Sequence, residues 1–224
     1  MLDAAFAEAR KPAPPDGPYD QEHPKRWESG RDFSMQLPFY GFEHVDLCTA
    51  HGDQVGGQDR TAIEAFQPRP QVVETMVRRG LTNLTSQATA RAAWLSLLTL
   101  DDIVGLKVYS RPGQTSGTRP AVVAAIAQSL IAAGMRPDQI IIWDKEEADL
   151  REAGFVKLAA QLGVRVAAST QAGYNATNYY DTPLIGNLLF GELEFEKKGD
   201  GVGRKSFVAK IVTSEMTKII NITP

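Results

Sequence analysis

The chain has 224 residues, with 24 Lys and Arg against 27 Asp and Glu, so its formal net charge is −3 at pH 7. Hydrophobic residues make up 43% and charged residues 23%, a composition that indicates a folded globular protein and excludes a disordered or collagen-like chain. Charged residues interrupt every apolar run before it reaches the roughly 18 residues that a membrane-spanning helix needs. The acidic pI of about 5.7 argues against nucleic acid or an anionic membrane surface as a partner. The single cysteine, Cys48, excludes an internal disulfide and, since a cluster takes about four ligands, an iron–sulfur cluster held by this chain alone.

The length suits a single domain, residues 41–224, preceded by an extended proline-rich arm, residues 1–40. Proline fixes φ and removes a hydrogen-bond donor, so the arm is not predicted to form a packed element. Its aromatic residues Trp27, Phe33 and Phe39 would gain nothing from exposure, so we expect the arm to dock on its own domain or on another subunit of a homo-oligomer. The start of the chain has no apolar core of a secretory signal, which favours a cytoplasmic protein unless an export signal has been removed.

Regular structure is predicted from about residue 60. Pro70 suits the first turn of a helix that ends at Gly80. A second helix follows, and three residues are candidates for its N-cap: Thr82, Asn83 or Thr85.

Residues 102–169 alternate between strand and helix patterns. The predicted elements are a strand at 102–109, a helix that starts at Pro120 and ends at Gly134, a strand at 139–144, helical pattern at 146–162 with a break at Gly154, and a strand at 164–168. This alternation is typical of parallel strands joined by right-handed crossovers. The predicted fold is therefore α/β, with an open, mostly parallel Rossmann-like sheet that carries helices on both faces.

After residue 170 the pattern changes. Residues 171–181 are polar and aromatic without a helix or strand period, which predicts a loop. Residues 188–195 and 206–212 are predicted to form an antiparallel hairpin with a glycine-rich tip, and residues 218–222 a last buried strand. An apolar strand so near residue 224 leads us to expect that the functional unit is completed by further residues or by a second chain.

The loop at 110–119 lies at the carboxyl end of a predicted parallel strand and leads into a helix, which is where open α/β sheets bind ligands. Four of its residues carry hydroxyl or guanidinium groups that suit a carboxylate or phosphate: Thr115, Ser116, Thr118 and Arg119. The alternative is structural: Thr118 caps the helix, the glycines form turns and Arg119 is solvated.

Lys107 is the one charge in an apolar strand, and Asp144 ends the next strand of the unit. Because an unpaired buried ammonium is costly, we expect these two residues to face each other across adjacent parallel strands. With Glu146 they form a group that suits a small anion through the lysine, or a divalent metal through the carboxylates. A structural ion pair, or a lysine at the rim of the sheet, is the alternative.

His44, Cys48 and His51 have the spacing H-x3-C-x2-H, and imidazole and thiolate are ligands for zinc, iron or copper. The alternative is that Cys48 is a small buried apolar residue.

Several segments resemble the bacterial family called domain of unknown function 362; they lie at 102–108, 117–123, 130–134, 139–144 and 152–155. The resemblance implies a Rossmann-like α/β domain, which in some members is joined to iron–sulfur modules or preceded by a twin-arginine export signal. The activity of that family is not established. Since this chain lacks cluster cysteines, an iron–sulfur role would need a partner chain. Residues 117–120 also resemble the Thr-Arg-Pro segment of nickel-dependent lactate racemase-type proteins.

These observations favour a protein that binds a small anionic ligand or a metal at the carboxyl ends of its parallel strands, with a redox-linked role as one form of that function. The alternative is a non-catalytic assembly subunit that uses its aromatic arm and glycine-rich hairpin. Whether the chain is an enzyme stays open, because it has no G-x-S-x-G or comparable catalytic motif.

Overall fold

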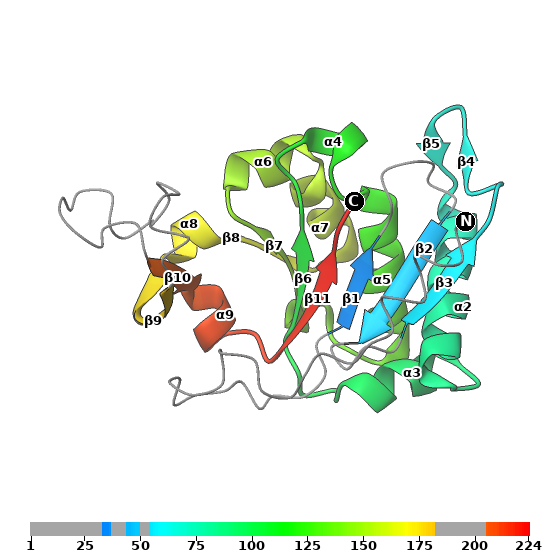
Figure 1. Cartoon of the computed structure of the whole chain (residues 1–224), viewed down its shortest axis with the longest axis horizontal. Helices are drawn as coiled ribbons and strands as arrows, with labels where there is room; N and C mark the ends of the chain where they lie inside the picture. Colours follow the sequence, from blue (N-terminus) through cyan, green and yellow to red (C-terminus); the bar gives the residue numbers. More distant parts are fainter. Residues whose placement is uncertain (1–32, 37–43, 50–53, 182–204) are drawn as a thin grey trace, which may run out of the picture. The chain divides into compact units, whose positions relative to one another are not determined.

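The structure is a computed structural model and describes residues 33–36, 44–49, 54–181 and 205–224. Its centre is a seven-stranded sheet in the order β3-β2-β1-β11-β6-β7-β8 (Figure 1). The strands are β1 (Phe33–Gln36), β2 (His44–Thr49), β3 (Gln54–Gln58), β4 (Ile63–Glu64), β5 (Gln67–Pro68), β6 (Val104–Val108), β7 (Ile140–Asp144), β8 (Arg165–Ala168), β9 (Tyr174–Asp181), β10 (Lys205–Ala209) and β11 (Lys218–Ile222). The helices are α2 (Pro70–Thr85), α3 (Ala90–Leu97), α4 (Gly113–Ser116), α5 (Pro120–Ala133), α6 (Glu147–Glu152), α7 (Phe155–Leu162), α8 (Ser169–Ala172) and α9 (Lys210–Ser214).

Five neighbouring strands run parallel: β1, β11, β6, β7 and β8. At one end of the sheet, β2 pairs antiparallel with both β1 and β3. The α/β fold with a parallel sheet, helices that flank it and a separate antiparallel strand pair near the C-terminus confirms the fold class that the sequence predicts. None of the helices that the structure describes is long and apolar enough to span a membrane.

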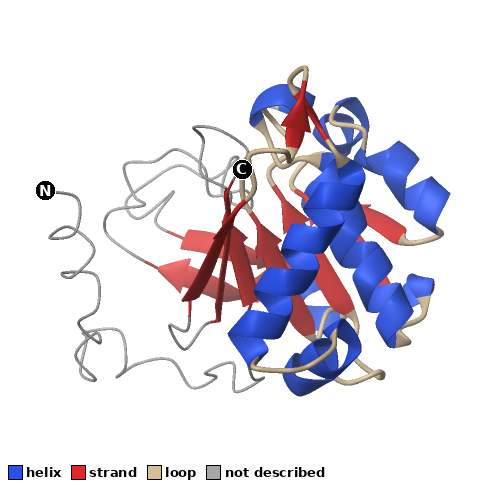
Figure 2. Cartoon of the chain, turned by 90° about the vertical axis from the view of Figure 1, so that its right-hand side faces the viewer, coloured by secondary structure: helices blue, strands red, loops and turns tan. Residues whose placement is uncertain are grey.

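One face of the sheet forms the main core beneath α2, α3, α5 and α7, which Figure 2 shows gathered on the same side. Alternate strand residues such as Leu106, Ile142 and Ile220 point to this core and are almost fully buried. α5 connects β6 to β7 on this face; Pro120 occupies its first turn, and Gly134 ends it in a left-handed conformation at φ 112°.

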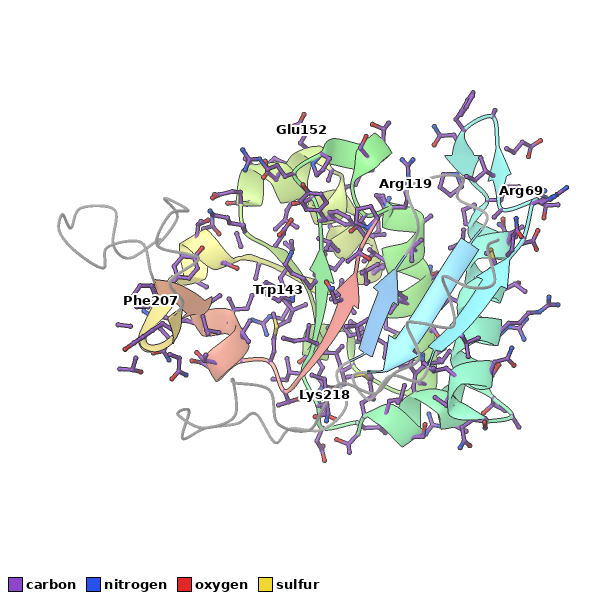
Figure 3. The ribbon with its side chains drawn as sticks, in the orientation of Figure 1. Arg69, Arg119, Trp143, Glu152, Phe207 and Lys218 are labelled. Carbon is purple, nitrogen blue, oxygen red and sulfur yellow. The ribbon has the colours of Figure 1, made fainter. Side chains whose placement is uncertain are left out.

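The opposite face is covered by a second, smaller apolar cluster. Ile141 and Trp143 of β7 meet Ala209, Ile211 and Met216, which come from β10, α9 and the turn before β11. Trp143 lies on the side of β6 and β7 that faces α9 (Figure 3). The connection from β8 to β11 therefore crosses the face of the sheet opposite α5.

The N-terminal half differs from the prediction in two places. Strands β2 and β3 precede residue 60, and four residues of the predicted arm form β1 beside β11. The helix predicted to end at Gly80 continues to Thr85, and the N-cap of α3 is Thr89, whose hydroxyl accepts from the amide of Ala92 at 3.1 Å. Glycine lowers helix stability by only about 1 kcal/mol, which packing of α2 on the sheet outweighs here.

The C-terminal region also differs from the prediction. The predicted loop at 171–181 is wrong over most of its length, because residues 174–181 form β9, the antiparallel partner of β10. The predicted strand at 206–212 is wrong from residue 210 onward, where α9 begins. The other predicted strand of that hairpin, at 188–195, lies outside the described residues. The strand at 218–222 is confirmed as β11.

Candidate functional site

Lys107 and Asp144 lie side by side at the carboxyl ends of β6 and β7. Lys107 is in register with Trp143, the residue before Asp144, and the Lys107 Nζ lies 2.7 Å from Asp144 Oδ1. The predicted pairing of these two residues across adjacent parallel strands is therefore confirmed. The strand order β6-β7 places them together, because the carboxyl ends of neighbouring parallel strands meet at one edge of a sheet.

Ser110 is the third member of this group. Its backbone amide and its hydroxyl both donate to Asp144 Oδ2, at 2.7 and 2.6 Å, and the residue is 1% exposed. The sequence placed Ser110 in a loop but did not single it out. Its position two residues after the end of β6 is the only sequence signal, and it does not distinguish Ser110 from the other loop hydroxyls.

Asp144 is held in its charged form. Burial raises the pKa of Asp144, but the hydrogen bonds from Lys107 and Ser110, together with the positive charge of Lys107, outweigh burial and lower the pKa below its ordinary value. Both carboxylate oxygens accept hydrogen bonds, so Asp144 serves as an anchor for Lys107 and for the loop after β6.

Lys107 is the exposed member of the pair. Its side chain is 30% exposed, against 10% for that of Asp144. A lysine ammonium has three N–H donors; besides Asp144, it donates to the carbonyl of Val108 at 2.5 Å. The ammonium also lies 5.5 Å from the centre of a Trp143 ring, within the range of a cation–π contact. The ammonium is thus held in place by its hydrogen bonds, while part of the lysine side chain is exposed to solvent.

Thr118 has a structural role that differs from the predicted helix cap. Its hydroxyl donates to the carbonyl of Ile222 at 2.5 Å and accepts from the amide of Tyr109 at 2.8 Å, and the residue is fully buried. The N-cap of α5 is Arg119, which makes no side-chain cap. Thr118 therefore ties the end of β6 to the end of β11.

Arg119 supports the loop from inside. It is 9% exposed, so the predicted alternative of a solvated Arg119 is wrong, and its guanidinium donates to the carbonyl of Gln114 in α4. Burial lowers the pKa of Arg119 below its ordinary value. Figure 3 shows Arg119 and Glu152 at the end of the sheet toward which β6 and β11 point; Gln114 links the two, since its side chain donates to the carbonyl of Glu152 at 3.2 Å.

The remaining predicted ligand residues do not join the hydrogen bonds of this group. Thr115 and Ser116 are exposed on α4, and within the described part of the chain neither is hydrogen-bonded to Lys107 or Asp144. Glu146 is the N-cap residue before α6, and its carboxylate accepts from the Thr170 hydroxyl at 3.1 Å. The structure thus brings together Lys107, Asp144 and Ser110.

A divalent metal was the other ligand that the sequence suggested for this group. Among the residues that the structure describes, no three His, Cys, Asp or Glu side chains are grouped closely enough to hold a metal ion. The proposed ligands His44 and Cys48 belong to β2, but their side chains, and His51 as a whole, lie outside the described part of the chain.

The group lies beside a topological switch point of the sheet. The chain leaves β6 through α5 on one face, and it reaches β11 through α8, β9, β10 and α9 on the opposite face. β6 and β11 are neighbours in the sheet, as Figure 1 shows. Open α/β sheets bind ligands at the carboxyl ends of strands where the winding reverses in this way. Lys107 of β6 and its register partner Asn221 of β11 lie at this point.

Comparison with known proteins finds no relative of this chain. No protein-family model, no curated protein and no solved structure matches it.

Proposed function

We propose that the protein binds a small anionic molecule, a carboxylate or a phosphate, at the carboxyl ends of β6 and β11, with Lys107 as the charged contact. The observation that carries this proposal is the state of the Lys107 ammonium. Hydrogen bonds to Asp144 and Val108 hold it in position, and its side chain is 30% exposed at the switch point of the sheet.

An ammonium fixed in this way suits a ligand better than a mobile surface lysine does. Within the described part of the chain, Asp144 and Val108 accept two hydrogen bonds from the ammonium, which has three N–H groups, so one N–H is available to a ligand. The entropy cost of ordering the side chain is already met in the unliganded protein, so less of the binding energy is lost on association. Asp144 balances the charge, which favours a ligand with a single negative charge over a highly charged one.

Membership of the domain of unknown function 362 family is part of this proposal. The proposed anion binding does not rest on that membership, because the family has no established activity. The anion is favoured over the metal because the oxygens of Asp144 already accept hydrogen bonds from Lys107 and Ser110.

Titration of the purified chain with acetate and with inorganic phosphate, followed by backbone amide NMR, tests the proposal. We expect saturable shifts at the amides of Lys107, Ser110 and Asn221. These shifts should be lost in Lys107→Met combined with Asp144→Asn, a pair of changes that leaves no uncompensated carboxylate. Lys157→Met, on the exposed side of α7, is the control. Equal titration curves in the wild type and the double variant would overturn the proposal.

A further inference from the structure

Tyr109 is an exposed aromatic residue two positions after Lys107 in the chain. It follows β6 and is 48% exposed, whereas Val108 before it is 1% exposed and lies in the core beneath α5. Side chains alternate between the two faces of an extended chain. Lys107 and Tyr109 therefore lie on the same side of β6, the side opposite the main core.

Both backbone polar groups of Tyr109, its amide and its carbonyl, are hydrogen-bonded to Thr118. Its amide donates to the Thr118 hydroxyl at 2.8 Å, and its carbonyl accepts from the Thr118 amide at 2.9 Å. Because Thr118 is itself fully buried, the Tyr109 backbone has a fixed position. A large ring is thus presented to solvent from a rigid base, and aromatic side chains lose little conformational entropy on contact since they have only two χ angles.

Asn221 completes the surface on the neighbouring strand. It pairs in register with Lys107 and is half-buried, between Ile220 and Ile222, which both lie in the main core. The same alternation places Asn221 on the side of Lys107 and Tyr109. Its amide offers a donor and an acceptor. One side of the switch point therefore presents an ammonium, an amide and an aromatic ring.

Building on the proposed function, we infer that the ligand carries a planar aromatic ring next to its anionic group, as aromatic carboxylates and aryl phosphates do. The anion contacts Lys107, the ring stacks on Tyr109, and Asn221 hydrogen-bonds a polar substituent. Aromatic pairs prefer offset-stacked or edge-to-face contacts and gain affinity beyond the area they bury. Tyr109 then determines specificity, and Lys107 supplies the charge contact that any anion uses.

Two probes of similar size and equal charge separate stacking from simple apolar contact: benzoate, which is planar, and cyclohexanecarboxylate, which is not. We expect the wild type to bind benzoate about 3- to 10-fold more tightly than cyclohexanecarboxylate. Tyr109→Leu should reduce this ratio to about one, and Tyr109→Phe should keep it, because Phe retains the ring. Phe66→Leu is the control, since Phe66 is an exposed aromatic residue in the β4–β5 hairpin.

The outcomes distinguish this inference from the proposal on which it rests. In one outcome, the wild type binds acetate and inorganic phosphate through Lys107 and yet binds benzoate and cyclohexanecarboxylate equally tightly. That result would overturn the aromatic ligand and leave anion binding intact. A benzoate preference that survives in Tyr109→Leu would also overturn the role of Tyr109. Failure of every probe, acetate and phosphate included, to bind the wild type would overturn both.

Discussion

Ser110 donates two hydrogen bonds to one oxygen of Asp144, from its amide and from its hydroxyl, while Lys107 bonds the other oxygen. A single carboxylate at the end of β7 therefore holds both the lysine of β6 and the first turn of the loop that leaves β6. Loops of α/β domains are the usual place for binding residues, and they need a rigid base to present them. Asp144 is that base here.

Replacement of Lys107 by Met should lower the free energy of unfolding by about 1–3 kcal/mol. The buried carboxylate of Asp144 loses a charged partner, and the cost is below that of a fully buried pair because Lys107 is partly exposed. Urea denaturation at pH 7 measures it. Lys157→Met, on the surface of α7, should change stability by less than about 0.5 kcal/mol. A Lys107→Met variant as stable as Lys157→Met would show that the pair contributes nothing.

The stability that Asp144 contributes should depend on pH. The folded-state pKa of Asp144 is lowered relative to the value of about 3.9 in an unfolded chain. The contribution is therefore present above the unfolded-state pKa and is lost as the pH falls through the folded-state pKa.

The wild type should accordingly exceed Asp144→Asn in stability most at neutral pH, and the difference should shrink on acidification below about pH 5. Urea denaturation of both chains between pH 7 and pH 3 measures this, with Asp138→Asn as an exposed control. Asp59 and Asp102, whose pKa values are also lowered, are present in both chains and cancel in the comparison. A difference that is constant with pH would contradict the charge role of Asp144.

Thr118→Val should destabilise the protein by about 1–3 kcal/mol, because it keeps the shape of threonine but leaves the buried Tyr109–Ile222 junction without its hydroxyl. Thr118→Ser retains the hydroxyl and should lose less. Thr115→Val, on the exposed side of α4, is the matched control. If valine and serine at position 118 were equally tolerated, the hydroxyl bridge would have no energetic role.

Gly105→Ala should destabilise the protein by about 1–3 kcal/mol through overpacking. A Cβ at this position would lie 2.2 Å from Met216 Sδ and 2.9 Å from Trp143 Nε1. Met216→Ala removes the nearer obstacle, so the double variant should be less destabilised than the sum of the two single changes, as a double-mutant cycle in urea measures. Strict additivity would show that the backbone moves instead.

The central unit was predictable because its signals are local. Apolar runs predicted β6, β7 and β8, Pro120 and Gly134 bounded α5, and Gly154, in a left-handed conformation at φ 88°, separates α6 from α7 as predicted. Strands with weaker local signals were missed. β3 contains Gly56 and Gly57, and β9 is polar; both exist because a neighbouring strand supplies their backbone hydrogen bonds.

The candidate site was also predictable from the sequence only in part. The pair Lys107 and Asp144 followed from the sequence, since each lies at the end of a consecutive buried strand and a charge there needs a partner. The role of Ser110 did not follow, because several hydroxyl residues of the same loop had equal claims as partners of Asp144. The burial of Arg119 and the bridge through Thr118 likewise depend on how α4 and β11 pack against the loop.

By itself, the sequence determined the order of strands and helices in the parallel unit, because apolar runs and helix-ending residues are local signals. It also determined the need of Lys107 for a carboxylate, because a charge in a buried strand requires a partner. Only the tertiary structure decided that β11 enters the sheet between β1 and β6, which places Asn221 beside Lys107. A strand's own residues define its two faces, but its neighbours are decided by the backbone hydrogen bonds of the whole sheet. The switch point, and the surface proposed to bind a ligand there, are consequences of that order.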